Sequence, residues 1–267
     1  MKKFLFAGIA ATAFYGVAAF AADLPYKAPP TPVLAPSWAG FYLGLNGGWG
    51  WSNITDAETP FGVTGIGGIL PQSLGTSLNG GVFGGQIGYN WQVQRWVFGV
   101  EGDFDAAGIN GGSQVVFRDL LGGAGGTATD GFMTRDNINW LASIRGRVGM
   151  TWGSSLAYVT GGAAWESVKT TAMISTDTDP AIFSQSAIGS STTTRAGYVV
   201  GGGYEWMIVP KWTVRGEYLF YGFGGGSTNA INIPFCTDLG GTGCGVNHTT
   251  GSNNISIVRL GVNYLFN

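Results

Sequence analysis

The sequence predicts an all-β fold, an eight-stranded antiparallel transmembrane β-barrel with short turns at one end and four long loops at the other. First, eight stretches between residues 38 and 267 alternate apolar residues with small or polar ones, as strands do when one face meets lipid. Second, the gaps between these stretches are alternately long and short. Third, no apolar run beyond residue 21 approaches the roughly 20 residues of a helical span, so a membrane location requires a closed sheet.

The composition agrees with this fold class. Glycine supplies 48 of the 267 residues and aromatic residues supply 13%, whereas only 10% are charged, which fits neither an ordinary soluble domain nor a disordered polar chain. The formal net charge is −2, and it becomes −4 if Lys2 and Lys3 are removed with a leader. This balance gives no support to nucleic-acid binding.

The first 37 residues are expected to lie outside the barrel. Lys2 and Lys3 precede an apolar run over residues 4–20 that ends in a small-x-small site, so residues 1–21 are predicted to be a signal peptide. A retained membrane anchor is the alternative. Residues 22–37 contain five prolines and are predicted to form an extended periplasmic tether. The barrel is then expected to occupy residues 38–267.

Eight strands are predicted in order along the remaining chain. They span residues 38–52, 80–92, 96–107, 137–152, 156–168, 195–208, 212–223 and 254–266. Three connectors are tight, at residues 93–95, 153–155 and 209–211, and four are long, at residues 53–79, 108–136, 169–194 and 224–253. Bacterial outer-membrane barrels have short periplasmic turns and long external loops, so both termini are expected in the periplasm.

Tryptophan positions predict the two edges of the lipid-facing band. Nine of the ten tryptophans share the outward phase of their strands and lie near strand ends, as expected of an aromatic girdle. One row contains Trp91, Trp96, Trp152, Trp206 and Trp212, and the other contains Trp49, Trp51, Trp140 and Trp165. Trp38 is out of phase.

The opposite phase collects the charges of the strands. Six acids and five arginines are predicted to face the lumen: Glu101, Asp103, Asp105, Glu166, Glu205 and Glu217 with Arg145, Arg147, Arg195, Arg215 and Arg259. An eight-stranded barrel is only wide enough for side chains to fill it, so these groups are expected to form an interior charge network with each other and with Tyr42, Asn46, Gln86, Asn90 and Asn263. A conductive or catalytic role for them is the alternative.

The candidates for site chemistry are few. His248 is the only histidine, and no Cys/His cluster at ligand spacing accompanies it, so a solvated loop residue is favoured over a haem or metal ligand. Ser143 and Ser256 lie on predicted strands, but nothing places His248 beside either. No catalytic residue, cofactor or metal is therefore expected. Cys236 and Cys244 share the fourth long loop, where a disulfide between them is expected and two free thiols are the alternative.

Three segments carry a family resemblance: the opening WAGFYLGLNGGWGWS, the string GGQIGYNWQ before the first turn, and the closing VRLGVNYLFN, which contains the terminal strand LGVNYLFN. Together they resemble the small alphaproteobacterial outer-membrane proteins described as porin-family or OmpA-like β-barrels. The resemblance implies an abundant surface protein that supports envelope integrity and is often antigenic, with haemin binding attributed to some members. It also implies that Tyr264 and Phe266 form a signal for the barrel-assembly machinery, although Asn267 follows the aromatic residue that usually ends such chains.

The expected function is therefore structural, with surface interaction through the external loops. Outer-membrane lipid, lipopolysaccharide and the assembly machinery are the expected partners, and a host or environmental ligand is expected at the loops. The fourth loop, with Phe235, Val246 and His248 around its cysteines, is the first candidate surface. A small diffusion pore is the alternative function, and a barrel enzyme that acts on envelope lipids is a weaker one.

Overall fold

The computed structural model describes residues 36–61, 72–118, 129–177, 185–226, 228–233, 244–249 and 251–266. The predicted signal peptide lies outside these residues, and so does nearly all of the predicted tether. No helix in the described part of the chain has the length and apolar character of a membrane span.

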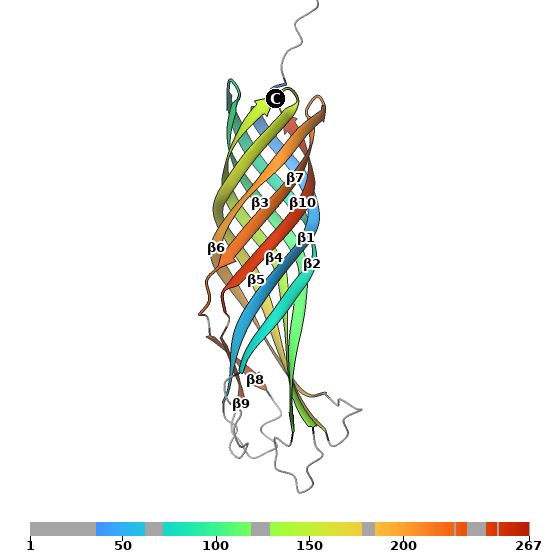
Figure 1. Cartoon of the computed structure of the whole chain (residues 1–267), viewed down its shortest axis with the longest axis vertical. Coiled ribbons are helices and arrows are strands. Elements are labelled where there is room, and N and C mark those ends of the chain that lie inside the picture. Colours follow the sequence, from blue (N-terminus) through green and yellow to red (C-terminus); the bar gives the residue numbers. More distant parts are fainter. Residues whose placement is uncertain are drawn as a thin grey trace, which may run out of the picture. The chain divides into compact units, whose positions relative to one another are not determined.

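Ten strands form one sheet, and eight of them close into a ring (Figure 1). The strands are β1 (Gly40–Phe61), β2 (Gln72–Val93), β3 (Trp96–Arg118), β4 (Thr129–Trp152), β5 (Ser155–Asp177), β6 (Gln185–Val209), β7 (Trp212–Phe223), β8 (Thr228–Ile233), β9 (Cys244–Thr249) and β10 (Asn253–Phe266). Strands β1 to β7 pair with their sequence neighbours, and β10 pairs with both β7 and β1; every pairing is antiparallel. The predicted eight-stranded antiparallel barrel is confirmed.

Three tight hairpins lie at one end of the ring. They join β2 to β3, β4 to β5 and β6 to β7, and each contains one residue with a positive φ: Gln94 at 54°, Gly153 at 60° and Lys211 at 70°. Such left-handed residues are typical of short hairpins. Phe41 at the start of β1 pairs with Phe266 at the end of β10, so the first and last strands of the ring meet at this same turn end.

The opposite end differs from the prediction of four long loops. Strands β1 to β6 continue through residues 53–61, 72–79, 108–118, 129–136, 169–177 and 185–194, all of which were predicted as loop. In this extension the described buried positions are mixed: Ile54 and Leu78 are apolar, whereas Thr134 and Asp136 are polar, and exposed neighbours such as Asn53 are polar. The prediction was wrong here because the outward face is polar and the inward face includes threonine and aspartate, so these segments lack the apolar alternation of the membrane strands and resemble loops.

A short hairpin of β8 and β9 completes the extended end. β10 pairs with β1 as far as Ile54, and β9 then pairs with residues 57–61 of β1. Beyond the points where β7 and β10 stop at the extended end, the β8–β9 hairpin therefore lies next to β1, with β9 as its pairing partner. This part of the predicted fourth loop is sheet.

Two apolar clusters fill the lumen on either side of a charged middle. Near the turn end, Trp38, Val97, Leu156 and Tyr158 are buried together. Toward the extended end lies a larger cluster, which contains Ile54, Leu78, Val82, Ile109, Ile138, Leu141, Ala164, Val168, Val199, Leu219, Tyr221, Phe223, Ile255 and Ile257. Trp38 is completely buried, and its backbone N–H donates to Gln92 Oε1 at 2.8 Å.

Candidate functional site

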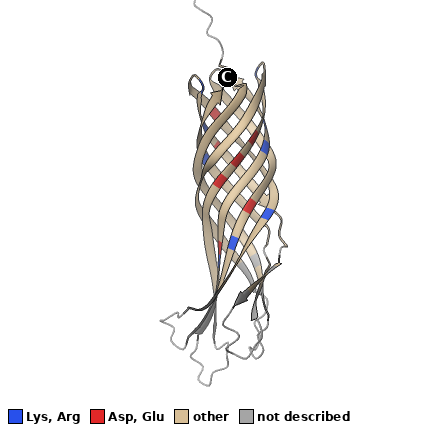
Figure 2. Cartoon of the chain, turned by 180° about the vertical axis from the view of Figure 1, so that it is seen from behind, with Lys and Arg blue, Asp and Glu red and all other residues tan. Residues whose placement is uncertain are grey.

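The inner face of the ring carries all eleven charged side chains that the sequence placed there. Each is buried, because residues two apart on a strand point to the same face, as Glu101, Asp103 and Asp105 do on β3. Nine of them meet in the middle of the barrel, which we call the central network: Glu101, Asp103, Asp105, Arg145, Arg147, Glu205, Arg215, Glu217 and Arg259. Figure 2 shows charged residues along the strands of the ring.

Arg145 on β4 connects three carboxylates. Its Nε donates to Asp103 Oδ2 at 3.1 Å, its Nη1 donates to Glu217 Oε1 at 3.0 Å, and its Nη2 forms an ion pair with Glu101. Ser143 Oγ also donates to Asp103 Oδ2 at 2.5 Å. β7, which carries Glu217, is not a sheet neighbour of β4, so Arg145 crosses the lumen and ties opposite walls together.

Arg215 and Arg259 make the other links across the lumen. Arg215 donates to both oxygens of Glu101, at 2.6 Å and 3.2 Å. Arg259 Nη1 donates to Asp105 Oδ2 at 2.8 Å, and its Nε donates to Glu217 Oε2 at 2.8 Å. The planar guanidinium group suits this arrangement, because one arginine can serve two carboxylates at fixed angles.

Arg147 ends the network toward the turn end. Its guanidinium carbon lies 4.5 Å from the ring centre of Tyr42 and 5.3 Å from that of Tyr158, within cation–π range. Arg147 Nη1 donates to Glu205 Oε2 at 3.2 Å, and its Nε donates to Asn90 Oδ1 at 2.9 Å. Arg147 therefore joins the charged middle to aromatic and amide side chains.

Inward polar residues complete the hydrogen bonding. Tyr42 Oη donates to Glu101 Oε2 at 2.5 Å, and Asn263 Nδ2 donates to Glu205 Oε1 at 2.7 Å. Asn46 and Gln86 continue this chain to Asn263, with separations of 2.8 Å and 2.7 Å. With Asn90, these four residues were the predicted partners. Tyr158 and Thr213, which also bond to network carboxylates, were not predicted. Their inward phase was the available signal.

The single eleven-residue network predicted from sequence is divided in two. Arg195 Nη2 lies 2.7 Å from Glu166 Oε1, and Asn253 Nδ2 donates to Glu166 Oε2 at 2.9 Å. On β10, Ile255 and Ile257 separate Asn253 from Arg259 of the central network. The Glu166–Arg195 pair therefore lies toward the extended end, separated from the central network by residues of the larger apolar cluster.

The central network leaves no water-accessible path along its side chains. No ion-paired side chain in it is more than 2% exposed. Inward glycines allow this density: an added Cβ at Gly84 would collide with Asp105, and one at Gly88 would collide with Tyr42. A water-filled channel would instead leave its lining accessible, so this arrangement braces the walls of the barrel.

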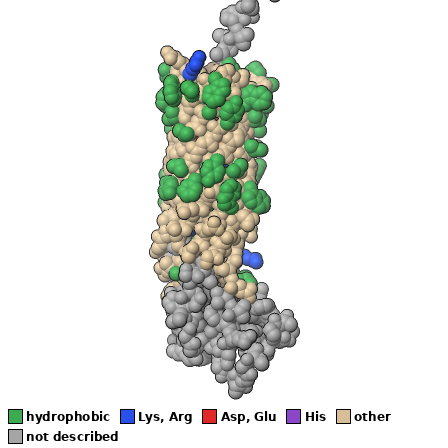
Figure 3. Space-filling view, viewed as in Figure 1, with side chains coloured by type: hydrophobic (Ala, Val, Ile, Leu, Met, Phe, Trp, Pro, Cys, Tyr) green, Lys and Arg blue, Asp and Glu red, His purple; other side chains and the backbone are tan. Residues whose placement is uncertain are grey.

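The outer face is apolar across the ring. Leu260 is 70% exposed and Val159 is 66% exposed, values that are typical of lipid contact rather than of a soluble surface. Figure 3 shows the hydrophobic side chains on one face of the ring. Seven of the nine predicted girdle tryptophans are 43% to 55% exposed, and Trp140 and Trp165 are half-buried.

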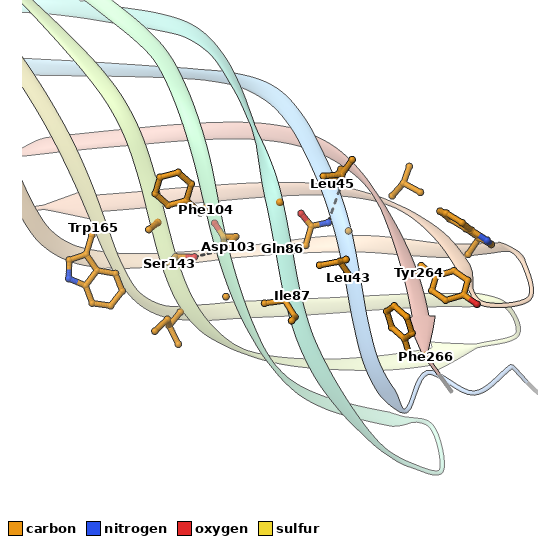
Figure 4. Close-up of a pocket in the computed structure, with 17 residues that line it drawn as sticks. Leu43, Leu45, Gln86, Ile87, Asp103, Phe104, Ser143, Trp165, Tyr264 and Phe266 are labelled. Carbon is orange, nitrogen blue, oxygen red and sulfur yellow. Dashed lines mark hydrogen bonds between the residues drawn. The ribbon is translucent and has the colours of Figure 1, made fainter.

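The apolar face also has a shallow hollow of about 860 Å³. Figure 4 shows Gln86 and Asp103 next to the hydrophobic Ile87 and Phe104 of the same strands, and it shows Trp165 turned away from the barrel. The hollow is lined mainly by lipid-facing side chains. Its position and apolar character fit lipid chains rather than a polar substrate.

Tyr264 and Phe266 lie in this outer surface at the turn end. Their rings meet edge to face with centroids 4.9 Å apart, and Tyr264 makes a similar contact with Trp212 at 5.1 Å. Phe266 is 59% exposed. Both residues are therefore part of the aromatic row at that end.

The residues weighed for catalysis and ligand binding are not brought together. Ser143 bonds to Asp103 in the lumen, while Ser256 lies on the exposed face 3.0 Å from the Tyr218 hydroxyl. The expectation of a solvated His248 was wrong: its side chain is 1% exposed, and its Nε2 lies 3.4 Å from Thr170 Oγ1.

The candidate surface in the fourth loop is only partly visible. Cys236 and Phe235 lie outside the described residues, and so does the predicted disulfide. Cys244 and Val246 lie in β9, and at these two positions the structure describes the backbone alone. Because His248 is buried, it cannot form part of an exposed ligand surface in this conformation.

Comparisons with known proteins place this architecture in a family. Residues 7–236 match the family model described as outer membrane protein beta-barrel domain. The chain is 30% identical over 279 residues to the 31 kDa outer-membrane immunogenic protein of Brucella melitensis biotype 1, with 100% of both chains covered. It is 32% identical over 196 residues to the 22 kDa outer membrane protein of Rhizobium leguminosarum bv. viciae, which covers 73% of this chain and 67% of that protein.

Among solved structures, the outer membrane protein OprG from Pseudomonas aeruginosa is similar, with 16% identity and a TM-score of 0.41 over 85% of this chain and 97% of that one. The family match and the full-length relative agree with the barrel described above. The chain is therefore a member of the outer-membrane β-barrel protein family and an outer-membrane protein.

Proposed function

We propose that the protein is a closed structural barrel that supports the outer membrane and presents its extended end for contact with ligands or host molecules. The central network carries this proposal, because its bonded charges fill the lumen where a diffusion pore would need water. The proposed role is non-enzymatic. The alternative, a small pore, would require a path that avoids Arg145, Arg215 and Arg259.

The proposal includes an orientation. The tight hairpins, the start of β1 and the end of β10 would lie in the periplasm, and the extension of β1 to β6 with the β8–β9 hairpin would lie outside the cell. The Brucella relative is named as immunogenic. By analogy, we infer that the extended end of this protein is the part that antibodies and partners reach.

The proposal also assigns a role in biogenesis to the end of β10. Tyr264 and Phe266 lie at the turn end of the barrel, and their aromatic side chains point outward. An assembly factor could contact them there before β10 pairs with β1. We propose that the barrel-assembly machinery recognises this aromatic end.

Two matched epitope insertions test the orientation and the display role. Gly224, which follows β7 at the extended end, and Gly153, in the β4–β5 turn, both border open space. With a tag after Gly224, antibody should label intact cells. With the tag after Gly153, labelling should require permeabilised cells. Labelling of the Gly153 tag on intact cells would overturn the orientation, provided that both variants remain folded and heat-modifiable.

A further inference from the structure

The exposed charged side chains that the structure describes on the barrel are all of one sign. Among residues whose side chains the structure describes, four charged side chains are exposed, and all four are basic: Arg95, Arg135, Lys169 and Lys211. Arg95 and Lys211 lie in tight turns, whereas Arg135 and Lys169 lie on β4 and β5 beyond the apolar face. Figure 3 shows basic side chains near both ends of the hydrophobic region and no acidic side chain on that face.

Arg135 and Lys169 are close neighbours on the outer surface. Arg135 pairs with Thr171 across β4 and β5, and Asn137 pairs with Lys169 in the adjacent row. The two basic residues are thus diagonal neighbours on one face, about 7–8 Å apart between their backbones. Neither forms an ion pair with any described residue. Two unpaired cations held this close favour a shared anionic ligand.

A hollow lies directly beside Arg135. It has a volume of about 270 Å³ and is lined by Asn110, Gly111, Gly112, Ser113, Gln114, Met133 and Arg135. Gly112 pairs with Arg135 across β3 and β4, so the missing side chain opens space next to the guanidinium group. The exposed Asn110 and Gln114 add amide groups to this space. A guanidinium group with nearby amide donors matches the oxygens of a phosphate.

The position of the pair relative to the membrane indicates which anion it meets. Arg135 is five residues beyond Trp140 on β4, and Lys169 is four residues beyond Trp165 on β5. At the rise and tilt of barrel strands, this places them about 10 Å beyond the aromatic row, within reach of lipid headgroups for long side chains. Their outward direction continues the lipid-facing surface.

We propose that Arg135 and Lys169, with Asn110 and Gln114, bind the phosphate-bearing headgroup of a membrane lipid at the extended end of the barrel. The assignment of this headgroup to the outer leaflet, and hence to lipopolysaccharide, rests on the proposed orientation. The site lies on the wall of the barrel, separate from the external tips where partner contact is proposed. It would fix the depth of the barrel in the membrane.

Binding of lipopolysaccharide to purified protein in a neutral detergent tests the site. The test variant is Arg135→Gln with Lys169→Gln. The matched control is Arg95→Gln with Lys211→Gln, which removes the same charge from the turn end. The test pair should weaken binding by about tenfold or more, and the control pair by no more than about twofold. Dephosphorylated lipopolysaccharide should bind wild type as weakly as intact lipopolysaccharide binds the test pair.

Three results would overturn the proposal: unchanged binding by the test pair, an equal loss in both pairs, or displacement of the lipid by millimolar inorganic phosphate. The last result would indicate a site for free phosphate. Heat-modifiability shows whether each variant is folded. Because binding in detergent does not depend on which end faces outward, a reversed tag pattern would refute the orientation alone and leave this test intact.

Discussion

The membrane part of the barrel and its extension expose opposite kinds of residue on the same strands. On β4, Arg145 faces the lumen while its neighbour Ile144 is 63% exposed to lipid. Farther along β4, Ile138 is buried and Asn137 and Arg135 face outward. The outward residues of one strand thus change from apolar to polar along its length, and the point of this change marks the edge of the membrane. The difference teaches that alternation identifies a strand, whereas the residue type on each face identifies its surroundings.

The two interiors also differ in how they are stabilised. The central network depends on directional bonds among five carboxylates and four arginines, in which each group serves several partners. The larger apolar cluster toward the extended end depends on apolar contacts, which have no directional requirement. Loss of one member should therefore be most costly in the central network.

The largest effect is expected for Arg145→Ala. This change leaves Glu101, Asp103 and Glu217 short of a positive partner in a dry lumen, so it should lower the free energy of unfolding by about 3–5 kcal/mol. The measurement is the denaturant midpoint for the barrel in detergent. The double variant with Glu101→Ala should lose at least about 1 kcal/mol less than the sum of the two single variants. Strictly additive losses would show that these groups are not a coupled network.

A smaller effect is expected in the larger apolar cluster, where β4 supplies a matched pair. Ile138→Ala removes a completely buried side chain from the apolar cluster and should cost about 2–4 kcal/mol. Ile144→Ala removes the same atoms from the lipid-facing surface of β4 and should cost about 1 kcal/mol or less. Equal shifts of the midpoint would contradict a packed apolar interior at Ile138.

The isolated ion pair should be more tolerant than the central network. After Arg195→Ala, Glu166 keeps the hydrogen bond from Asn253, and only one carboxylate loses its partner, so a loss of about 1–3 kcal/mol is expected. The same denaturation experiment measures it. A loss equal to that of Arg145→Ala would mean that the two charge clusters act as one despite the apolar residues between them.

The smallest effect on the finished fold is expected at the end of β10. Replacement of Tyr264 and Phe266 by Leu keeps two apolar outward side chains, so refolding in detergent should change by about 1 kcal/mol or less. Insertion in cells should fall clearly, since the proposed recognition signal is lost. Normal surface levels of this double variant would remove the biogenesis role from the two rings.

The eleven inward charged residues could be predicted from the sequence because they share one phase of the alternation in each strand. A shift of that phase by one residue would turn every charge toward lipid. It did not predict the extension, because polar outward residues such as Asn53 resemble a loop. Irregular pairing between Ala106 and Ile109, and between Ile138 and Trp140, also interrupts the alternation at the reversal.

The pairing of residues across the lumen also could not be predicted from the sequence. Arg259 meets Asp105, although the two are 154 residues apart, and the stagger of the closed ring decides which residues share a level. The same stagger places Glu166 and Arg195 apart from the other nine charges. The alternation along one strand shows which face a residue occupies, but it does not show which residues of other strands lie at the same height along the barrel axis.

Single-channel recording of the refolded, heat-modifiable protein in planar bilayers tests the closed lumen most directly. Because the central network fills the barrel, wild type should show no steady conductance steps over the voltage range in which the bilayer is stable. Reproducible steps of uniform size from the wild-type monomer, with passage of small solutes, would contradict the closed barrel and identify the protein as a diffusion pore.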